Sequence, residues 1–139
     1  MKRSGAYFKL FYHFIWSTRS RLPLITPALE PVLYNHLQDK CRENGYRLIA
    51  LSGTDNHIHL LIELKPTMCV ADVAKILKGA SSHYINKESG LPDTLYWQDG
   101  YGVLSLREGD VASVTNYINN QREHHAAGKL SDVLERVSE

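Results

Sequence analysis

The residues best suited to chemistry are a pair of histidines and, further along the chain, a tyrosine and a glutamine. His57 and His59 are separated by Ile58. In a strand, residues i and i+2 project from the same face, so the two imidazoles would lie side by side. Two neutral imidazoles so placed can share one divalent metal. The spacing also arises by chance, and exposed strand histidines without a metal are the alternative interpretation.

Tyr117 and Gln121 are the second pair, one helical turn apart. A tyrosine phenol can attack a phosphodiester and form a phosphotyrosine. Its ordinary pKa is ~10, so at neutral pH the phenol is a weak nucleophile and needs help. A divalent metal supplies that help by polarising the scissile phosphate, and a carboxamide oxygen can be a metal ligand. A tyrosine that only packs at the edge of the core is the alternative.

A β-hairpin is the element that must position the histidines. The sequence predicts strands over Arg47–Thr54 and His57–Leu64, joined at Asp55 and Asn56, which favour tight turns. Along the second strand Ile58, Leu60, Ile62 and Leu64 form an apolar face toward the core. His57 and His59 then lie on a polar face, which we expect to be open to solvent.

The remaining elements complete a small α+β fold. We expect a central strand over Tyr7–Trp16, because both of its faces are apolar. Helices are expected from about Leu29 to Gly45, from Val70 to Tyr84 and from about Asp110 to His124, with short strand pieces at Tyr96–Gln98 and Gly102–Leu106. The order βαββαβα is simplest as a ferredoxin-like antiparallel sheet with helices packed on one face, plus a C-terminal helix that carries Tyr117.

The composition agrees with one globular domain over residues 1–139. Hydrophobic residues make up 43% and charged residues 22%, which excludes a disordered or fibrous chain. No apolar run reaches the ~18 residues that a membrane-spanning helix needs. Two cysteines, Cys41 and Cys69, are too few for a disulfide framework. With no export signal, we expect free thiols and a cytoplasmic protein.

Basic residues are concentrated near the N-terminus. Up to Glu30, the first carboxylate, the charged side chains are all cationic, and Arg19 and Arg21 flank Ser20 in a polar loop. Guanidinium and hydroxyl groups together hold phosphates well, although a solvated loop would have the same composition. Lys75 and Lys78 lie off the apolar stripe of the middle helix and are further candidates for phosphate contacts. Residues 130–139 lean acidic, so we expect them to avoid DNA.

Five motifs in order give the chain a family resemblance. His57-Ile58-His59 lies within Asp55–Ile62, and the tyrosine motif is Tyr117–Gln121; the other three are Tyr12–Arg19, Leu77–Ser82 and Trp97–Gly102. Over residues 7–125 the chain resembles the small single-tyrosine transposases of the HUH endonuclease superfamily, in which HUH denotes histidine, a hydrophobic residue and histidine. These enzymes move insertion sequences as single-stranded DNA.

The resemblance implies a function and roles for named residues. His57 and His59 would hold Mg²⁺ or Mn²⁺ with Gln121 as the third ligand, and Tyr117 would be the nucleophile. The chain would be a homodimer, with Tyr117 and Gln121 completing the histidine site of the same or of the other chain. It would cleave and rejoin single-stranded DNA with hairpin-forming ends through a 5′-phosphotyrosine. Arg19, Arg21, Lys75 and Lys78 would contact DNA.

One departure and two alternatives accompany this interpretation. Relatives often have Pro-Asp before the first histidine, where this chain has Asp55-Asn56, so any carboxylate role behind the histidine would pass to Asp55. A non-catalytic nucleic-acid-binding module of the same fold is the first alternative. A metal-dependent enzyme with two histidines and the carboxylate of Glu63 or Asp55 is the second.

Overall fold

Alternating strands and helices make up the fold, in the order that the sequence predicts. The computed structural model describes residues 5–121 and 133–137. The elements are β1 (Leu10–Ser17), α1 (Leu29–Glu43), β2 (Arg47–Gly53), β3 (His57–Leu64), α2 (Val70–Lys87), β4 (Gly102–Leu106) and α3 (Val111–Asn119), with 3-10 turns at Arg19–Arg21 and Glu108–Asp110.

The four strands form one antiparallel sheet in the order β2-β3-β1-β4. The α+β, ferredoxin-like prediction is therefore confirmed. β1 pairs with both β3 and β4, so it is a central strand, as the sequence predicts. The predicted hairpin of β2 and β3 is also present, with Asp55 and Asn56 in its turn.

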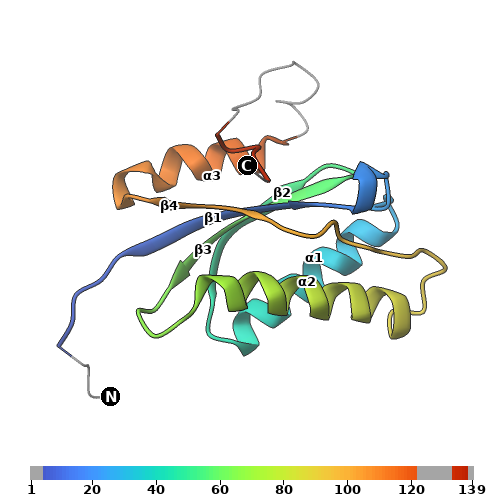
Figure 1. Ribbon diagram of the computed structural model, residues 1–139, viewed down its shortest axis with the longest axis horizontal. Coiled ribbons are helices and arrows are strands. Elements are labelled where there is room, and N and C mark those ends of the chain that lie inside the picture. The colour runs from blue at the N-terminus through green and yellow to red at the C-terminus, as the bar shows by residue number, and fades with distance from the viewer. Residues whose placement is uncertain (1–4, 122–132, 138–139) are drawn as a thin grey trace.

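Helices α1 and α2 cover one face of the sheet (Figure 1). The predicted stripe of α1 is buried: Leu29, Leu33, Leu37 and Cys41. Pro31 lies in the first turn, where the missing N–H removes no intrahelical hydrogen bond. Gly45 follows the last turn with a φ of 74°, a left-handed conformation that glycine adopts without strain. The side chains of β3 that pack here are Ile58, Leu60, Ile62 and Leu64.

Helix α3 lies on the opposite face, separated by the sheet from α1 and α2 (Figure 1). Val114 and Ile118 anchor it against Leu61 of β3 and Ala50 of β2. This apolar contact is small, and polar side chains occupy the rest of the face.

Some boundaries differ from the prediction. β1 begins at Leu10 instead of Tyr7, and Tyr96–Gln98 forms only an isolated bridge between Trp97 and Thr18. The predicted end of the last helix at His124 lies outside the described residues. Among the residues that are described, no helix is long and apolar enough to cross a membrane.

Candidate active site

The two histidines of β3 point toward α3, as the alternation along the strand predicts. Their exposure differs from the prediction, because His57 is 2% and His59 0% exposed. The expectation of an open histidine face was therefore wrong. Strand pairing with β1 and β2 closes the sides, while α3 and a segment from the C-terminal region cover the top.

His57 is held from behind by the hairpin turn. Its Nδ1 lies 2.8 Å from Oδ1 of Asn56 and 2.9 Å from Oγ1 of Thr54. An acceptor at Nδ1 leaves the Nε2 lone pair facing the site, as in most metal-binding histidines. The supporting acceptor is therefore the amide of Asn56, and the suggested carboxylate role of Asp55 is not observed.

Tyr117 on helix α3 and Gln121, just beyond its C-cap, lie against the histidines of the same chain. Gln121 is fully buried, and its Oε1 lies 3.3 Å from Nε2 of His57. Its Nε2 donates to the Tyr117 carbonyl at 3.3 Å, a contact that the spacing of one helical turn between the two residues makes possible. The Tyr117 ring lies edge-on to His59, 6.1 Å between centroids. All four residues predicted for the catalytic centre therefore come together.

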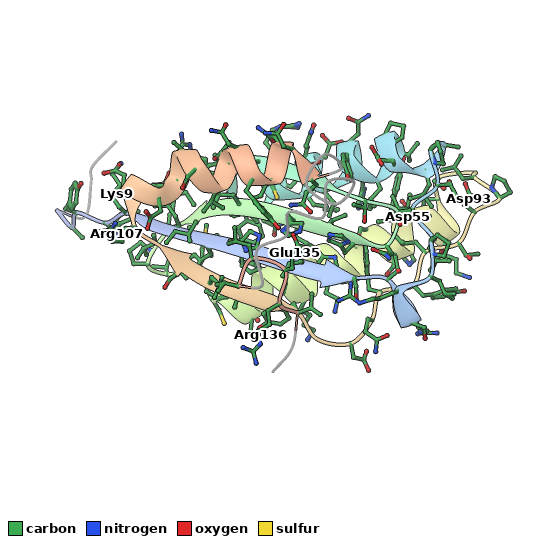
Figure 2. The ribbon with its side chains drawn as sticks, turned by 90° about the horizontal axis from the view of Figure 1, so that it is seen from above. Lys9, Asp55, Asp93, Arg107, Glu135 and Arg136 are labelled. Carbon is green, nitrogen blue, oxygen red and sulfur yellow. The ribbon has the colours of Figure 1, made fainter. Side chains whose placement is uncertain are left out.

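Glu135 is a further residue at the centre, and sequence reasoning missed it. One carboxylate oxygen lies 3.2 Å from Nε2 of both His57 and His59, and the other accepts a hydrogen bond from the Tyr117 hydroxyl at 2.5 Å. Figure 2 shows Glu135 above the middle of the sheet, far from Asp55 at one end. Burial alone would raise the pKa of Glu135, but its contacts with His57, His59 and Tyr117 outweigh the burial and lower that pKa below its ordinary value.

A glycine makes room for the segment that carries Glu135. A Cβ on Gly102 of β4 would overlap the carbonyl oxygen of Arg136 and crowd Ile15 of β1. The backbone of residues 133–137 can therefore lie directly on β4 only where the strand has no side chain. The sequence did not indicate this contact, because the helical spacing of Leu130, Val133, Leu134 and Val137 does not say where the segment docks.

The donor atoms have a spacing that suits one divalent ion. His57, His59 and Glu135 form a group that could hold a metal ion, and Gln121 adds an amide oxygen beside it. The separations between neighbouring donors are 3.2, 3.2 and 3.3 Å. Ligands at ~2.1 Å from a six-coordinate ion lie about 3 Å apart, so oxygens at the positions of Glu135 and Gln121, beside the two imidazoles, suit the ion that the resemblance implies.

Glu63 and Asp55, the two carboxylates that the sequence suggested as metal ligands, do not lie at the histidine site. Glu63 lies at the far end of β3 and forms an ion pair with Arg47. Asp55 accepts a hydrogen bond from Ile25 through its backbone carbonyl, at 2.9 Å. A site of two histidines with Glu63 or Asp55 is therefore wrong for this chain, and the nearby carboxylate is Glu135.

Arg19 and Arg21 lie in an exposed turn directly after β1, at the end of the sheet where His57 begins β3. Ser20 and Arg21 have φ values of 55° and 53°, a left-handed conformation that is rare for residues other than glycine. The turn is held by Gln98, whose Oε1 accepts from the Ser20 amide at 2.9 Å. The Arg19 guanidinium lies over the Tyr96 ring, 5.1 Å from its centroid.

Lys75 and Lys78 lie on α2, across the sheet from the histidines. Lys75 is exposed. The Lys78 ammonium donates to the backbone carbonyls of Gln98 and Gly100, each at 2.8 Å, and burial lowers its pKa. Lys78 therefore fixes the loop before β4, a role that its sequence position did not indicate.

Comparisons with known proteins agree on one family. The model of the family described as IS200-like transposases matches residues 6–121. The ISDra2 transposase TnpA of Deinococcus radiodurans is 29% identical over 129 residues, 88% of this chain and 92% of the relative. The IS200 transposase of Salmonella typhimurium is 24% identical over 123 residues, 85% of this chain and 80% of the relative.

Two solved structures are similar to the chain. A crystal structure from Deinococcus radiodurans R1 has a TM-score of 0.67 and 32% identity, and the match covers 87% of this chain and 97% of that one. A REP-associated tyrosine transposase bound to a REP hairpin has a TM-score of 0.65 over 94% of this chain and 76% of its own. The second is only 16% identical, so its likeness concerns the fold.

Proposed function

Because this chain belongs to the family of IS200-like transposases, we propose that residues 1–139 act as one domain that cleaves and rejoins single-stranded DNA through a 5′-phosphotyrosine on Tyr117. The observation that carries the proposal is the position of the Tyr117 hydroxyl. It lies 2.5 Å from a carboxylate that is itself 3.2 Å from the imidazoles of His57 and His59. A phenol held against a candidate metal centre is placed to be a nucleophile.

The proposed reaction conserves the phosphodiester bond energy. The Tyr117 oxygen attacks the scissile phosphorus and loses its proton, while the bond to the 3′ oxygen breaks and that oxygen gains a proton. The 5′ phosphate stays on Tyr117. In the second step a 3′-OH attacks the phosphotyrosine, which restores the phenol and rejoins a strand. No nucleotide cofactor is needed.

His57, His59 and Gln121 would hold the divalent ion, Mg²⁺ or Mn²⁺. When bound, the ion polarises the phosphate and stabilises charge on the departing oxygen. Glu135 lies between the phenol and the imidazoles, where the scissile phosphate has to be for attack by Tyr117. We infer that the carboxylate and the phosphate compete for this position, since both are anionic oxygens that accept from the same groups.

The test is covalent capture of DNA labelled on the 3′ side of the cleavage site. With Mg²⁺ or Mn²⁺ and a hairpin-bearing single strand, the chain should form an adduct that survives detergent. Tyr117→Phe should form none, while Tyr7→Phe, a change at a strongly exposed tyrosine, should form it normally. An adduct that forms in EDTA contradicts the metal. Binding without any adduct favours the non-catalytic alternative.

Single-stranded DNA with a hairpin is the proposed substrate, because a phenol in this buried site cannot reach a phosphate inside an intact duplex. The REP-associated relative is bound to a hairpin, which supports the same kind of ligand here. A fully paired duplex should therefore be cleaved much more slowly than the hairpin-bearing strand. Equal cleavage of both contradicts the substrate.

Arg19 and Arg21 are the proposed phosphate contacts nearest the site, with Lys75 and Lys78 as more distant ones. Arg19→Ala with Arg21→Ala should weaken DNA binding and reduce the salt slope by about 1.4, since each contact to a single strand contributes ~0.7. Arg42→Ala is the matched control, because Arg42 is exposed on α1 and already paired with Asp39. An unchanged salt slope excludes the two arginines as contacts.

We propose a homodimer with both halves of each site on one chain. The strands β2 and β4 are the edges through which two sheets could join. The contacts of Gln121 and Tyr117 with His57, His59 and Glu135 within one chain support assembly in cis. A His57→Ala, His59→Ala chain mixed with a Tyr117→Phe chain should therefore stay inactive after subunit exchange. Recovered cleavage would instead mean that α3 is exchanged between subunits, and a monomer in sedimentation contradicts the dimer.

A further inference from the structure

A third histidine lies beside the proposed metal site without belonging to it. His13 of β1 is 1% exposed, and its Nε2 lies 2.8 Å from Nδ1 of His59. In the sheet His13 pairs with Leu61 and His59 pairs with Ile15, so the two histidines are diagonal neighbours on the face toward α3. Their ring centroids are 5.0 Å apart.

The contact with His59 is the one hydrogen bond that the His13 ring makes among the described residues. The other ring nitrogen, Nδ1, is buried and has no hydrogen-bond partner there. An apolar side chain would fill this position without burying an unpaired nitrogen. The ring is shielded from water beside a second imidazole, an environment that favours its neutral form.

A neutral imidazole can serve His59 in both arrangements that the site needs. With Glu135 in place, Nε2 of His59 faces a carboxylate 3.2 Å away and donates a proton to it. Nδ1 of His59 is then an acceptor, and His13 donates through Nε2. When Nε2 of His59 binds a metal it must offer a lone pair, so the proton of His59 lies on Nδ1 and His13 accepts it. The same hydrogen bond runs in either direction.

His57 has a comparable support of a different kind. Its Nδ1 faces the Asn56 and Thr54 oxygens from its own hairpin. His59 is the third residue of β3, and its Nδ1 takes its support from the neighbouring strand β1. His13 is the residue that supplies it.

We infer that His13 is a positioning residue, which accepts the Nδ1–H of His59 whenever His59 binds the divalent ion through Nε2. This inference rests on the metal site of the proposed function. It concerns a residue that touches neither the ion nor the DNA, and it acts only through His59.

The test measures Mn²⁺ binding by the full chain without DNA, from the electron paramagnetic resonance signal of free Mn²⁺. His13→Phe should weaken binding about 10–100-fold, the usual effect of losing a residue that supports a ligand. His13→Gln should restore it, because its amide can accept or donate at the position of the imidazole Nε2. A residue that only fills space would give the opposite order, since phenylalanine fits a buried site better than glutamine.

The matched controls are His36→Phe and His36→Gln. His36 of α1 stacks on Tyr84 of α2 with centroids 4.3 Å apart, on the face of the sheet opposite the histidine site. Both changes should therefore leave Mn²⁺ binding unaltered. If His13→Phe binds Mn²⁺ as tightly as the unaltered chain, or if His13→Gln binds no better than His13→Phe, the inference is overturned. If His57→Ala with His59→Ala also leaves binding intact, the proposed metal site fails and the inference fails with it.

If the His13 variants fail to fold, a measurement on the unaltered chain still tests the inference. Long-range ¹⁵N spectra of the imidazoles with Mg²⁺ bound should show His59 protonated on Nδ1, with that proton shared with Nε2 of His13. A proton on Nε2 of His59 in the metal-bound chain overturns the inference directly.

Discussion

The two faces of one sheet have opposite characters in this chain. Toward α1 and α2, the side chains of β1 and β3 are apolar and join one large cluster with the helices. Toward α3, a small cluster of Ala50, Leu61, Val114 and Ile118 lies beside His13, His57, His59 and Gln121, which are buried and polar. The strands are shared, so the difference comes only from which residues occupy alternate positions.

This difference teaches how a chain this short can bury a polar site. Buried polar groups destabilise a fold unless they are paired, and the α3 face carries several of them. The α1 and α2 face supplies most of the apolar burial and holds β1 and β3 in place from behind. Stability and chemistry are therefore separated across the thickness of the sheet, and neighbouring residues of one strand should respond oppositely to substitution.

The largest effect should come from His57 and Ile58, which are neighbours on β3 and both buried. His57→Ala should reduce metal-dependent cleavage by more than about a hundredfold, because it removes a proposed ligand. Ile58→Ala should keep cleavage in the folded protein but lower the free energy of unfolding by about 2–5 kcal/mol. Cleavage assays and urea titration measure the two responses.

A control for this pair is His83→Ala, at an exposed histidine of α2 that lies near Glu88. His83→Ala should change neither the rate of cleavage nor the free energy of unfolding. If Ile58→Ala abolished cleavage in fully folded protein, the two faces would not be separable.

The next effect should distinguish the apolar parts of the two faces. Leu60 and Leu61 are adjacent on β3 and both fully buried, in the large and the small cluster respectively. Leu60→Ala should cost about 3–5 kcal/mol, and Leu61→Ala about 2–3 kcal/mol, because α3 can shift to fill part of its cavity. The same shift should lower cleavage only in Leu61→Ala. Equal losses of stability would show that α3 is held as rigidly as α1 and α2.

A smaller effect is expected at Glu135. Glu135→Gln removes the charge that strengthens its hydrogen bonds, so the scissile phosphate should compete better and cleavage at limiting DNA should rise up to about tenfold. Gly102→Ala should act in the same direction, because its methyl group displaces the Arg136 carbonyl. If both changes lower cleavage, Glu135 is a working metal ligand and the competition is excluded.

The smallest effect concerns thiol chemistry, with no change in cleavage. Burial raises the pKa of Cys41 to about 12, so this thiol of the α1 face stays protonated and unreactive at pH 8. Cys69 is exposed just before α2. A thiol reagent should therefore modify one cysteine in the native chain and both in urea. Rapid modification of Cys41 in native protein would mean that the helical face opens readily.

The sequence predicted the parts of the site that follow from local periodicity. Alternation along β3 placed His57 and His59 on one face, and the one-turn spacing placed Tyr117 beside Gln121. The burial of the histidines could not be predicted, because the apolar spacing of the segment around Glu135 does not say where that segment docks. The choice of Asn56 over Asp55, and the contact of Lys78 with backbone carbonyls, likewise depend on how the turn and the loop fold in three dimensions.

The central place of β1 affects how the protein can be synthesised. β1 leaves the ribosome first, yet its partners lie far along the chain: Ile15 pairs with His59, and Phe11 with Leu106. The hairpin of β2 and β3 can form as soon as it emerges, whereas β1 waits with both apolar faces uncovered. His13, His59, Tyr117 and Glu135 therefore meet only after the segment that carries Glu135 has been synthesised. A growing chain therefore exposes apolar strand faces, which favour aggregation, before its candidate site can assemble.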